Sequence, residues 1–216
     1  MCNLYRQDIS QSKIISFFEK SSLSLTSTAR GLNLEPGYVG ADQNGPVLIN
    51  DGNNFLDYAT MRWGFPPVRE GARPITNIRN LTSAWWRGAN RAYTHDAEYR
   101  CLVPFSSFSE WDKASKSNAW FGVLAQAPMF AGVWRPWHGE RLKKVEGKKR
   151  RERQVHDWKL FAFLTTEPNT IVAPIHPKAM PVILTSSEEC EQWMSGGEKS
   201  FELQRPLPES LTKLAD

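Results

Sequence analysis

The chain has 216 residues, of which 40% are hydrophobic and 23% charged, and its formal net charge is +4 at pH 7. This composition predicts one globular domain spanning residues 1–216 and excludes disordered, collagen-like and repeat architectures. Apolar runs such as Leu160–Leu164 are far shorter than the roughly 20 residues that a membrane-spanning helix needs, so we expect no membrane partner. The first 20 residues contain no apolar signal region, and three cysteines are an odd count. We therefore expect a cytoplasmic protein without a disulfide framework.

The first half of the chain is predicted to alternate between helical and extended segments. Hydrophobic periodicity indicates the helices, whereas β-branched and aromatic runs bounded by glycine and proline indicate the strands. In chain order we expect a helix at Asp8–Glu19, a loop at Leu34–Gly45, strands at Val47–Asn50 and Phe55–Gly64, and a short helix at Thr82–Arg91.

The second half is predicted to be mostly antiparallel sheet, followed by one helix. Ser186 and Glu189 form a capping box, which predicts a helix to about Met194. The tail Gln204–Asp216, rich in proline, is expected to be a surface strap or partly disordered. These patterns favour an α+β fold, a single domain with a bent, barrel-like, mainly antiparallel β core and flanking helices. The expected strands are Arg100–Val103, Phe108–Trp111, Ala119–Leu124, Met129–Trp137 and Lys159–Thr166.

Most of the positive charge lies in one segment, 140–153. It contains eight basic and three acidic residues, a net charge of +5, so the rest of the chain sums to −1. Because the segment lies between two predicted strands, it is interpreted as a basic hairpin loop. Such a loop is either simply solvated or, beside a groove, a site that attracts phosphates.

Cys2 is the most informative position for chemistry. Removal of Met1 would leave a cysteine that carries both an α-amine and a β-thiol, and both groups titrate near enough to neutrality to act as nucleophiles. An aldehyde can condense with the amine to a Schiff base, after which the thiol closes a thiazolidine ring. Taken alone, however, Cys2 is better explained as an incidental second residue, since a free cysteine is often simply buried.

Three polar residues occur in apolar contexts: Asn77, Glu110 and His176. Glu110 stands between aromatic residues, where a carboxyl group tends to be desolvated and its pKa raised, as a general acid and base requires. His176 follows an apolar stretch at a chain reversal and could transfer protons or hold a sugar oxygen, although a lone histidine is more often structural.

Several motifs in chain order resemble the SOS response-associated peptidase (SRAP) family, and together they span the whole chain. They are Met1-Cys2, Trp63-Gly64, Asn77-Ile78-Arg79, Arg100–Pro104 with Phe108–Trp111, Phe130–Trp134, and His176 with Met180–Leu184.

The resemblance implies a protein that senses abasic sites in single-stranded DNA and forms a covalent thiazolidine crosslink through Cys2, which shields the lesion. Asn77 would orient the amine and the opened sugar, Glu110 would transfer protons, and His176 would stabilise or protonate the sugar oxygen. Reversal of the thiazolidine crosslink and an autoproteolytic step that exposes Cys2 are also compatible with the lyase-like and peptidase-type cysteine chemistry that the resemblance implies. The DNA contacts implied by position are Arg79, Trp111, Thr165 and Lys178.

The chain also departs from the family pattern. Asn3-Leu4 stands where the family usually has Gly-Arg, and 65–69 lacks the tryptophans that some members use as a wedge against DNA bases. We expect Pro67 and Val68 to wedge instead. Lys178 stands where an arginine is common, so a point charge replaces a bidentate fork.

Two other functions remain open. One is an N-terminal-nucleophile thiol peptidase or amidase with His176 as the base, and the other is a noncovalent reader of modified DNA. The cysteine and histidine spacings indicate no metal site, and no nucleotide-binding glycine loop is present. We therefore expect no cofactor, no obligate protein partner and a monomer.

Overall fold

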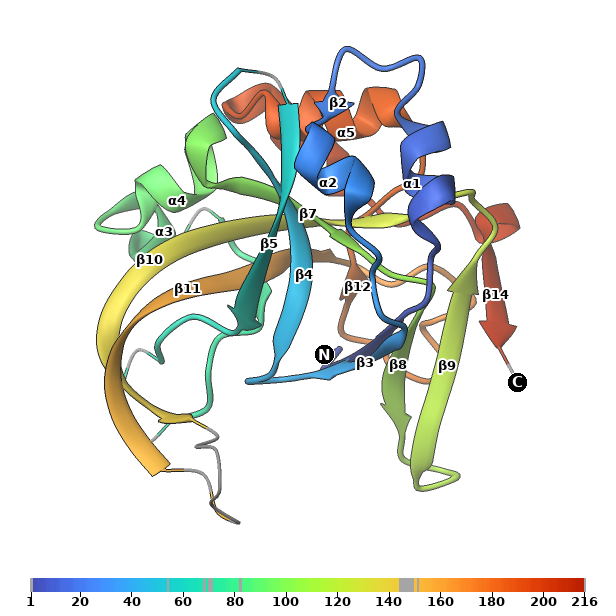
Figure 1. Ribbon diagram of the computed structural model, residues 1–216. Coiled ribbons are helices and arrows are strands. Elements are labelled where there is room, and N and C mark those ends of the chain that lie inside the picture. Colours follow the sequence, from blue (N-terminus) through green and yellow to red (C-terminus); the bar gives the residue numbers. More distant parts are fainter. Residues whose placement is uncertain are drawn as a thin grey trace.

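Two β-sheets and several short helices build the fold of the computed structural model (Figure 1). The structure describes residues 2–53, 55–67, 69, 72–81, 83–143, 150 and 152–215. The first sheet has five strands, all paired antiparallel. Its order is β14 (Thr212–Ala215), β9 (Ser117–Val123), β8 (Ser107–Asp112), β1 (Leu4–Gln7) and β3 (Gly37–Gly40).

The second sheet closes into a barrel. Its strands run in the order β12 (Met180–Pro181), β11 (Glu152–Thr166), β10 (Met129–Lys143), β7 (Arg100–Pro104), β4 (Asn44–Asn50), β5 (Phe55–Trp63) and β2 (Ser24–Leu25). β5 also pairs in parallel with β11, through Arg62 opposite Leu160 and Trp63 opposite Phe161. This pairing joins β11, β10, β7, β4 and β5 into a ring. Two short strands attach to it, β6 (Asn77–Ile78) to β11 and β13 (Ile183–Leu184) to β10.

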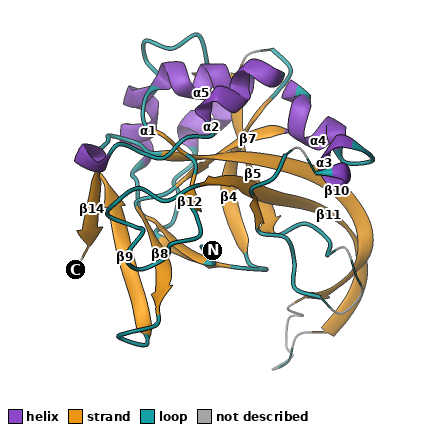
Figure 2. Ribbon diagram, turned by 180° about the vertical axis from the view of Figure 1, so that it is seen from behind, coloured by secondary structure: helices purple, strands orange, loops and turns teal. Residues whose placement is uncertain are grey.

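The helices gather over one end of the barrel, as the view from behind shows (Figure 2). They are α1 (Gln11–Phe17), α2 (Ser27–Gly31), α3 (Ala84–Arg87), α4 (Arg91–His95) and α5 (Ser187–Met194), with 3-10 turns at Ala97–Tyr99, Glu198–Leu203 and Glu209–Leu211.

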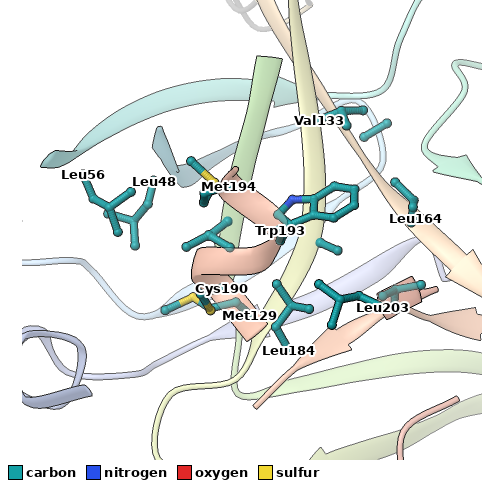
Figure 3. Packing of buried hydrophobic residues seen from close by; sticks show 14 of the residues in the cluster. Leu48, Leu56, Met129, Val133, Leu164, Leu184, Cys190, Trp193, Met194 and Leu203 are labelled. Atoms are coloured by element: carbon teal, nitrogen blue, oxygen red, sulfur yellow. The ribbon is translucent and has the colours of Figure 1, made fainter. Parts of the chain in front are cut away.

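Two hydrophobic clusters cover opposite faces of the barrel strands, because neighbouring side chains of a strand point to opposite faces. One cluster includes Leu102, Ala131 and the α5 residue Trp193, and Figure 3 shows the packing around Trp193. The Trp193 indole donates to the carbonyls of Cys101 and Gly132 at 3.1 and 3.0 Å. The other cluster joins the barrel to the five-stranded sheet. Its members include Cys2, Tyr5, Trp63, Phe108, Phe130 and Phe163.

The predicted fold class is confirmed: an α+β domain with a barrel of mainly antiparallel strands. The capping box is confirmed as well, since the Ser186 hydroxyl accepts a hydrogen bond from the Glu189 amide at 3.3 Å. The first helix is shorter than expected and covers only Gln11–Phe17.

Three expectations were wrong, two of them because long-range pairing overrides local turn signals. The predicted loop Leu34–Gly45 contains strand β3, which pairs with β1, and the start of β4. The predicted helix near Thr82–Arg91 is two short helices, α3 and α4, and Thr82 lies outside the described residues. The tail 204–216 is not a loose strap, because its strand β14 pairs with β9 and Leu207 is buried.

The basic segment 140–153 is only partly a loop. β10 and β11 pair without interruption from Gly132 opposite Phe163 to Lys143 opposite Glu152. The ends of the segment are therefore strand, while 144–149 and 151 lie outside the described residues.

Candidate functional site

Cys2 lies at the beginning of the chain between the barrel and the five-stranded sheet, where Figure 1 marks the N-terminus. Strand β1 runs between β3 and β8, with Leu4 opposite both Gly40 and Ser109. This pairing carries Cys2 toward the end of β8 that holds Glu110. Cys2 is buried, with 1% of its surface exposed, and its thiol lies 3.5 Å from the Leu4 carbonyl oxygen.

Asn77 holds the backbone of Cys2. Its Nδ2 donates to the Cys2 carbonyl oxygen and to the Thr76 hydroxyl, both at 2.8 Å. β6 places Asn77 opposite Phe163 of β11, so its side chain shares the face of the barrel on which Cys2 packs. Within the described part of the chain, the buried Oδ1 of Asn77 has no hydrogen-bond partner. A buried acceptor without a partner is unfavourable, so this oxygen is a candidate contact for a bound group.

Glu110 is the titrating group of the site. Its side chain is 2% exposed, and burial raises its pKa from 4.5 to about 7. Phe108 and Phe121, its neighbours on the same face of β8 and β9, are fully buried. A carboxyl group with a pKa near neutrality can both give and accept a proton in that range.

His176 faces Glu110 from the other side of the site, with 3.6 Å between its Nε2 and Glu110 Oε2. The turn that carries it is fixed by a bond from the His176 amide to the Val172 carbonyl, 2.9 Å, and by the pairing of β12 with the end of β11. Burial, together with nearby positive charges that include Lys178, lowers the pKa of His176 to about 4. At neutral pH the pair is therefore a neutral imidazole beside a titrating carboxyl, and not an ion pair.

The thiol of Cys2 is electrostatically linked to the same carboxyl. Burial, and then the charge of Glu110, raises the pKa of Cys2 well above its ordinary range. The thiol is thus protonated at neutral pH and needs a base before it can act as a nucleophile. The structure brings Cys2, Asn77, Glu110 and His176 together at one site.

Two of the predicted DNA contacts lie along the edge where β6 meets β11. Thr165 is buried, and in the described residues its hydroxyl lacks a hydrogen-bond partner. Arg79, two positions after Asn77, is exposed. Gln204 joins the two segments, because its Nε2 donates to the carbonyls of Arg79 and Thr165, each at 2.8 Å. The sequence did not point to Gln204, since it lies in a segment without a motif.

The remaining predicted contacts are spread around the site. Trp111, next to Glu110, is 53% exposed, and Lys178 is exposed near His176. Pro67 is half-buried and lines a cavity of about 390 Å³. Val68 lies outside the described residues.

A charged cluster that no sequence motif indicates lies at this cavity. Asp42 accepts from Arg62 at 2.8 and 2.7 Å and from Arg141 at 2.8 Å, and both arginines are buried. Since Asp42 and Arg141 are 99 positions apart, no local pattern links them.

In the described portion of the chain no group of three His, Cys, Asp or Glu side chains is placed to hold a metal ion. The same residues include no helix with the length and apolar character needed to cross a membrane.

Comparisons with known proteins agree with the fold. A protein from Bordetella bronchiseptica is 17% identical, with a TM-score of 0.70, covering 99% of this chain and 98% of that chain. A protein from Bacteroides thetaiotaomicron is 19% identical, with a TM-score of 0.65 and coverage of 99% and 90%. A phage-related protein from Bordetella bronchiseptica is 16% identical, with a TM-score of 0.62 and coverage of 99% and 93%. Identities this low show the shared fold alone.

The search of curated proteins gave no significant match. The family profile described as SOS response associated peptidase (SRAP), in contrast, matches residues 1–214. Membership of this family supports a function associated with DNA damage. The chain, which shares these motifs and this fold over almost its whole length, belongs to the SOS response associated peptidase family.

Proposed function

We propose that this protein recognises abasic sites in single-stranded DNA and captures their ring-opened aldehyde as a thiazolidine on Cys2. The observation that carries the proposal is that four functional groups lie at one site. Asn77 is hydrogen-bonded to the Cys2 backbone at 2.8 Å, and Glu110 lies beside both Cys2 and His176. An aldehyde is the substrate class that uses both nucleophiles of an N-terminal cysteine.

The proposed reaction begins after Met1 is removed. The α-amine of Cys2 adds to the aldehyde carbon, and the resulting carbinolamine loses its hydroxyl as water when Glu110 donates a proton. The product is a protonated imine (iminium), whose nitrogen keeps its own hydrogen. The thiol then adds to the iminium carbon, its proton passes to the Glu110 carboxylate, and the iminium nitrogen becomes the neutral ring amine. One water is released in total, and Glu110 returns to its starting protonated state.

Asn77 and His176 orient the reacting groups. Asn77 fixes the backbone of Cys2, which supports an orienting role toward the amine and, through its buried Oδ1, toward a hydroxyl of the opened sugar. His176 stays neutral at pH 7 because its pKa is about 4. Its role is to hydrogen-bond the sugar oxygen as the ring opens.

Exposed cationic side chains at the edge of the site fit a polyanionic substrate. Arg79 and Lys178 are both exposed near the polar groups, and contacts of this kind to phosphates hold a strand without reading its sequence. Trp111, 53% exposed, offers an aromatic face for stacking.

The test is a denaturing gel and intact-mass measurement after the purified protein is mixed with a single-stranded oligonucleotide that carries one abasic site. We expect an adduct that requires both the abasic site and Cys2, with undamaged DNA and the Cys2→Ala variant as controls. An adduct that persists in Cys2→Ala, or no adduct from protein whose Met1 has been removed, would contradict the proposal. Turnover of amide substrates in place of an adduct would favour an N-terminal-nucleophile hydrolase.

A further inference from the structure

The cavity of about 390 Å³ is not used by the chemistry proposed above. Its apolar walls come from Pro66, Pro67 and Pro74 and from Trp137 and Leu142 of β10, and charged side chains, among them Asp42 and Arg141, complete the lining. The volume lies within the range of small-molecule binding pockets.

The cavity adjoins the Cys2 site through two short stretches of chain. The amide of Ala41 donates to the Asn3 carbonyl at 3.0 Å, so that Asp42, which lines the cavity, directly follows a residue paired beside Cys2. Pro74 precedes Asn77 by three residues, which places their Cα atoms at most about 11 Å apart. Since Pro74 lines the cavity and Asn77 bonds to Cys2, the cavity lies beside the Cys2 site.

Arg141 lines the cavity and has one donor left unsatisfied by the residues that the structure describes. Its side chain is 7% exposed, and its Nη1 donates to Asp42 at 2.8 Å. Its buried Nη2 has no hydrogen-bond partner among the described residues. A buried donor without a partner is unfavourable, and a ligand with an acceptor atom would satisfy it.

The cluster around Arg141 carries a net positive charge. Burial alone would raise the pKa of Asp42, but the hydrogen bonds and charges of Arg62 and Arg141 outweigh it and hold that pKa below its ordinary value. One carboxylate therefore faces two arginines. At the rim, Arg153 and Glu140 pair with each other at 2.9 Å and cancel.

The aromatic wall is fixed in place. A Cβ at Gly139 would overlap the Trp137 indole, so the ring lies directly over the glycine backbone. Arg141 covers the same ring, with its guanidinium carbon 5.3 Å from the ring centroid. Trp158, opposite Trp137 in β11, donates to the Gly139 carbonyl at 2.9 Å and holds this part of the hairpin.

We propose that this cavity receives an unpaired nucleobase of the same DNA strand, next to the abasic nucleotide. Arg141 Nη2 donates to an acceptor on the base edge, and Trp137 and the prolines cover the ring. Every base has such an acceptor, and the Trp137 and proline walls suit a flat apolar ring, which a phosphate lacks. This inference rests on the proposed function and adds a second subsite to it.

The test measures noncovalent affinity by fluorescence anisotropy, with oligonucleotides that carry a tetrahydrofuran spacer in place of the abasic site and so offer no aldehyde. In a series, each neighbouring nucleotide is replaced in turn by a second spacer that lacks a base. We expect removal of the base at one neighbouring position to weaken binding by about tenfold, as loss of a good base contact does.

The variants Arg141→Gln and Arg141→Lys should lose this dependence on the base, with less than about a twofold difference between the two oligonucleotides. Arg141→Lys retains a positive charge beside Asp42, so it provides the test if Arg141→Gln fails to fold. The control Arg153→Gln removes the same charge at the rim and should keep the full dependence. Equal binding of all oligonucleotides by the wild type, or an unchanged dependence in both Arg141 variants, would overturn the proposal.

Adduct formation with a true abasic oligonucleotide separates this inference from the proposed function. If the wild type forms the adduct but binds every spacer oligonucleotide equally, only the cavity proposal fails. If the wild type forms no adduct and binds no DNA, both fail together. Base-dependent binding without an adduct would retain the cavity and reject the chemistry.

Discussion

Replacing Glu110 with glutamine is expected to stabilise the folded protein above pH 7 and to leave its stability unchanged near pH 4. The Glu110 side chain is 2% exposed, and burial raises its pKa from 4.5 to about 7. Between these values the unfolded chain has lost the proton that the folded protein keeps, so wild-type stability falls as the pH rises. The loss is complete once the pH exceeds the folded-state pKa and, at about 1.4 kcal/mol per pKa unit, amounts to about 3 kcal/mol. The uncharged Glu110→Gln variant avoids this loss.

Urea unfolding of both proteins between pH 4 and pH 8.5 measures the difference. The expected gain of Glu110→Gln over the wild type is near zero at pH 4 and about 3 kcal/mol at pH 8.5. Glu202→Gln, at an exposed position, is the matched control and should change stability by less than about 0.5 kcal/mol at any pH. A Glu110→Gln variant that is equally or less stable than the wild type at pH 8.5 would refute the reasoning. The same variant should lose adduct formation, because an amide cannot supply and take back the proton that the proposed steps need.

Three further changes have expected outcomes. Asn77→Ala removes the bond to the Cys2 carbonyl and should slow adduct formation about tenfold on a timed gel; an unchanged rate would exclude the orienting role. Gly64 has a φ of 125°, and a new Cβ there would lie 2.7 Å from a proline carbon. Gly64→Ala should therefore lower the free energy of unfolding, measured in urea, by about 2 kcal/mol or more. The control Gly52→Ala, where φ is also positive but the space is open, should cost clearly less. Ser186→Ala removes the cap of α5 and should lower Tm by about 2–4 °C; an unchanged Tm would show that the cap contributes nothing.

The parts of the fold that could be predicted from the sequence are those set by local chemistry. The α5 capping box needs only Ser186 and Glu189, three residues apart, and it formed as expected. The expected strands in β7, β8 and β9 likewise follow from apolar and aromatic runs within each strand. β3 could not be predicted, because its extended form depends on pairing with β1, which lies about thirty residues earlier in the chain.

The site also has one part that could be predicted from the sequence and one part that could not. Cys2, Asn77, Glu110 and His176 were predicted as candidates from their chemistry and their resemblance to a family, and the fold places them together. The cavity cluster of Asp42, Arg62 and Arg141 could not be found. Its members come from the β3–β4 turn, β5 and β10, and each alone is an ordinary charged residue in or beside a strand. Only closure of the barrel brings β5 and β10, through β11, to the same place.

The burial of Cys2 and Glu110 bears on the order of the proposed steps. Because burial raises the pKa of both groups, the thiol holds its proton at neutral pH while the carboxyl is divided between its two forms. The amine does not depend on the thiol proton, so it reacts with the aldehyde first, while protonated Glu110 can still donate to the departing hydroxyl. That donation leaves Glu110 as a carboxylate beside the thiol, which is then the base that ring closure needs. One buried carboxyl with a pKa near 7 thus serves both steps in turn, whereas an exposed carboxylate would enter the first step already without its proton.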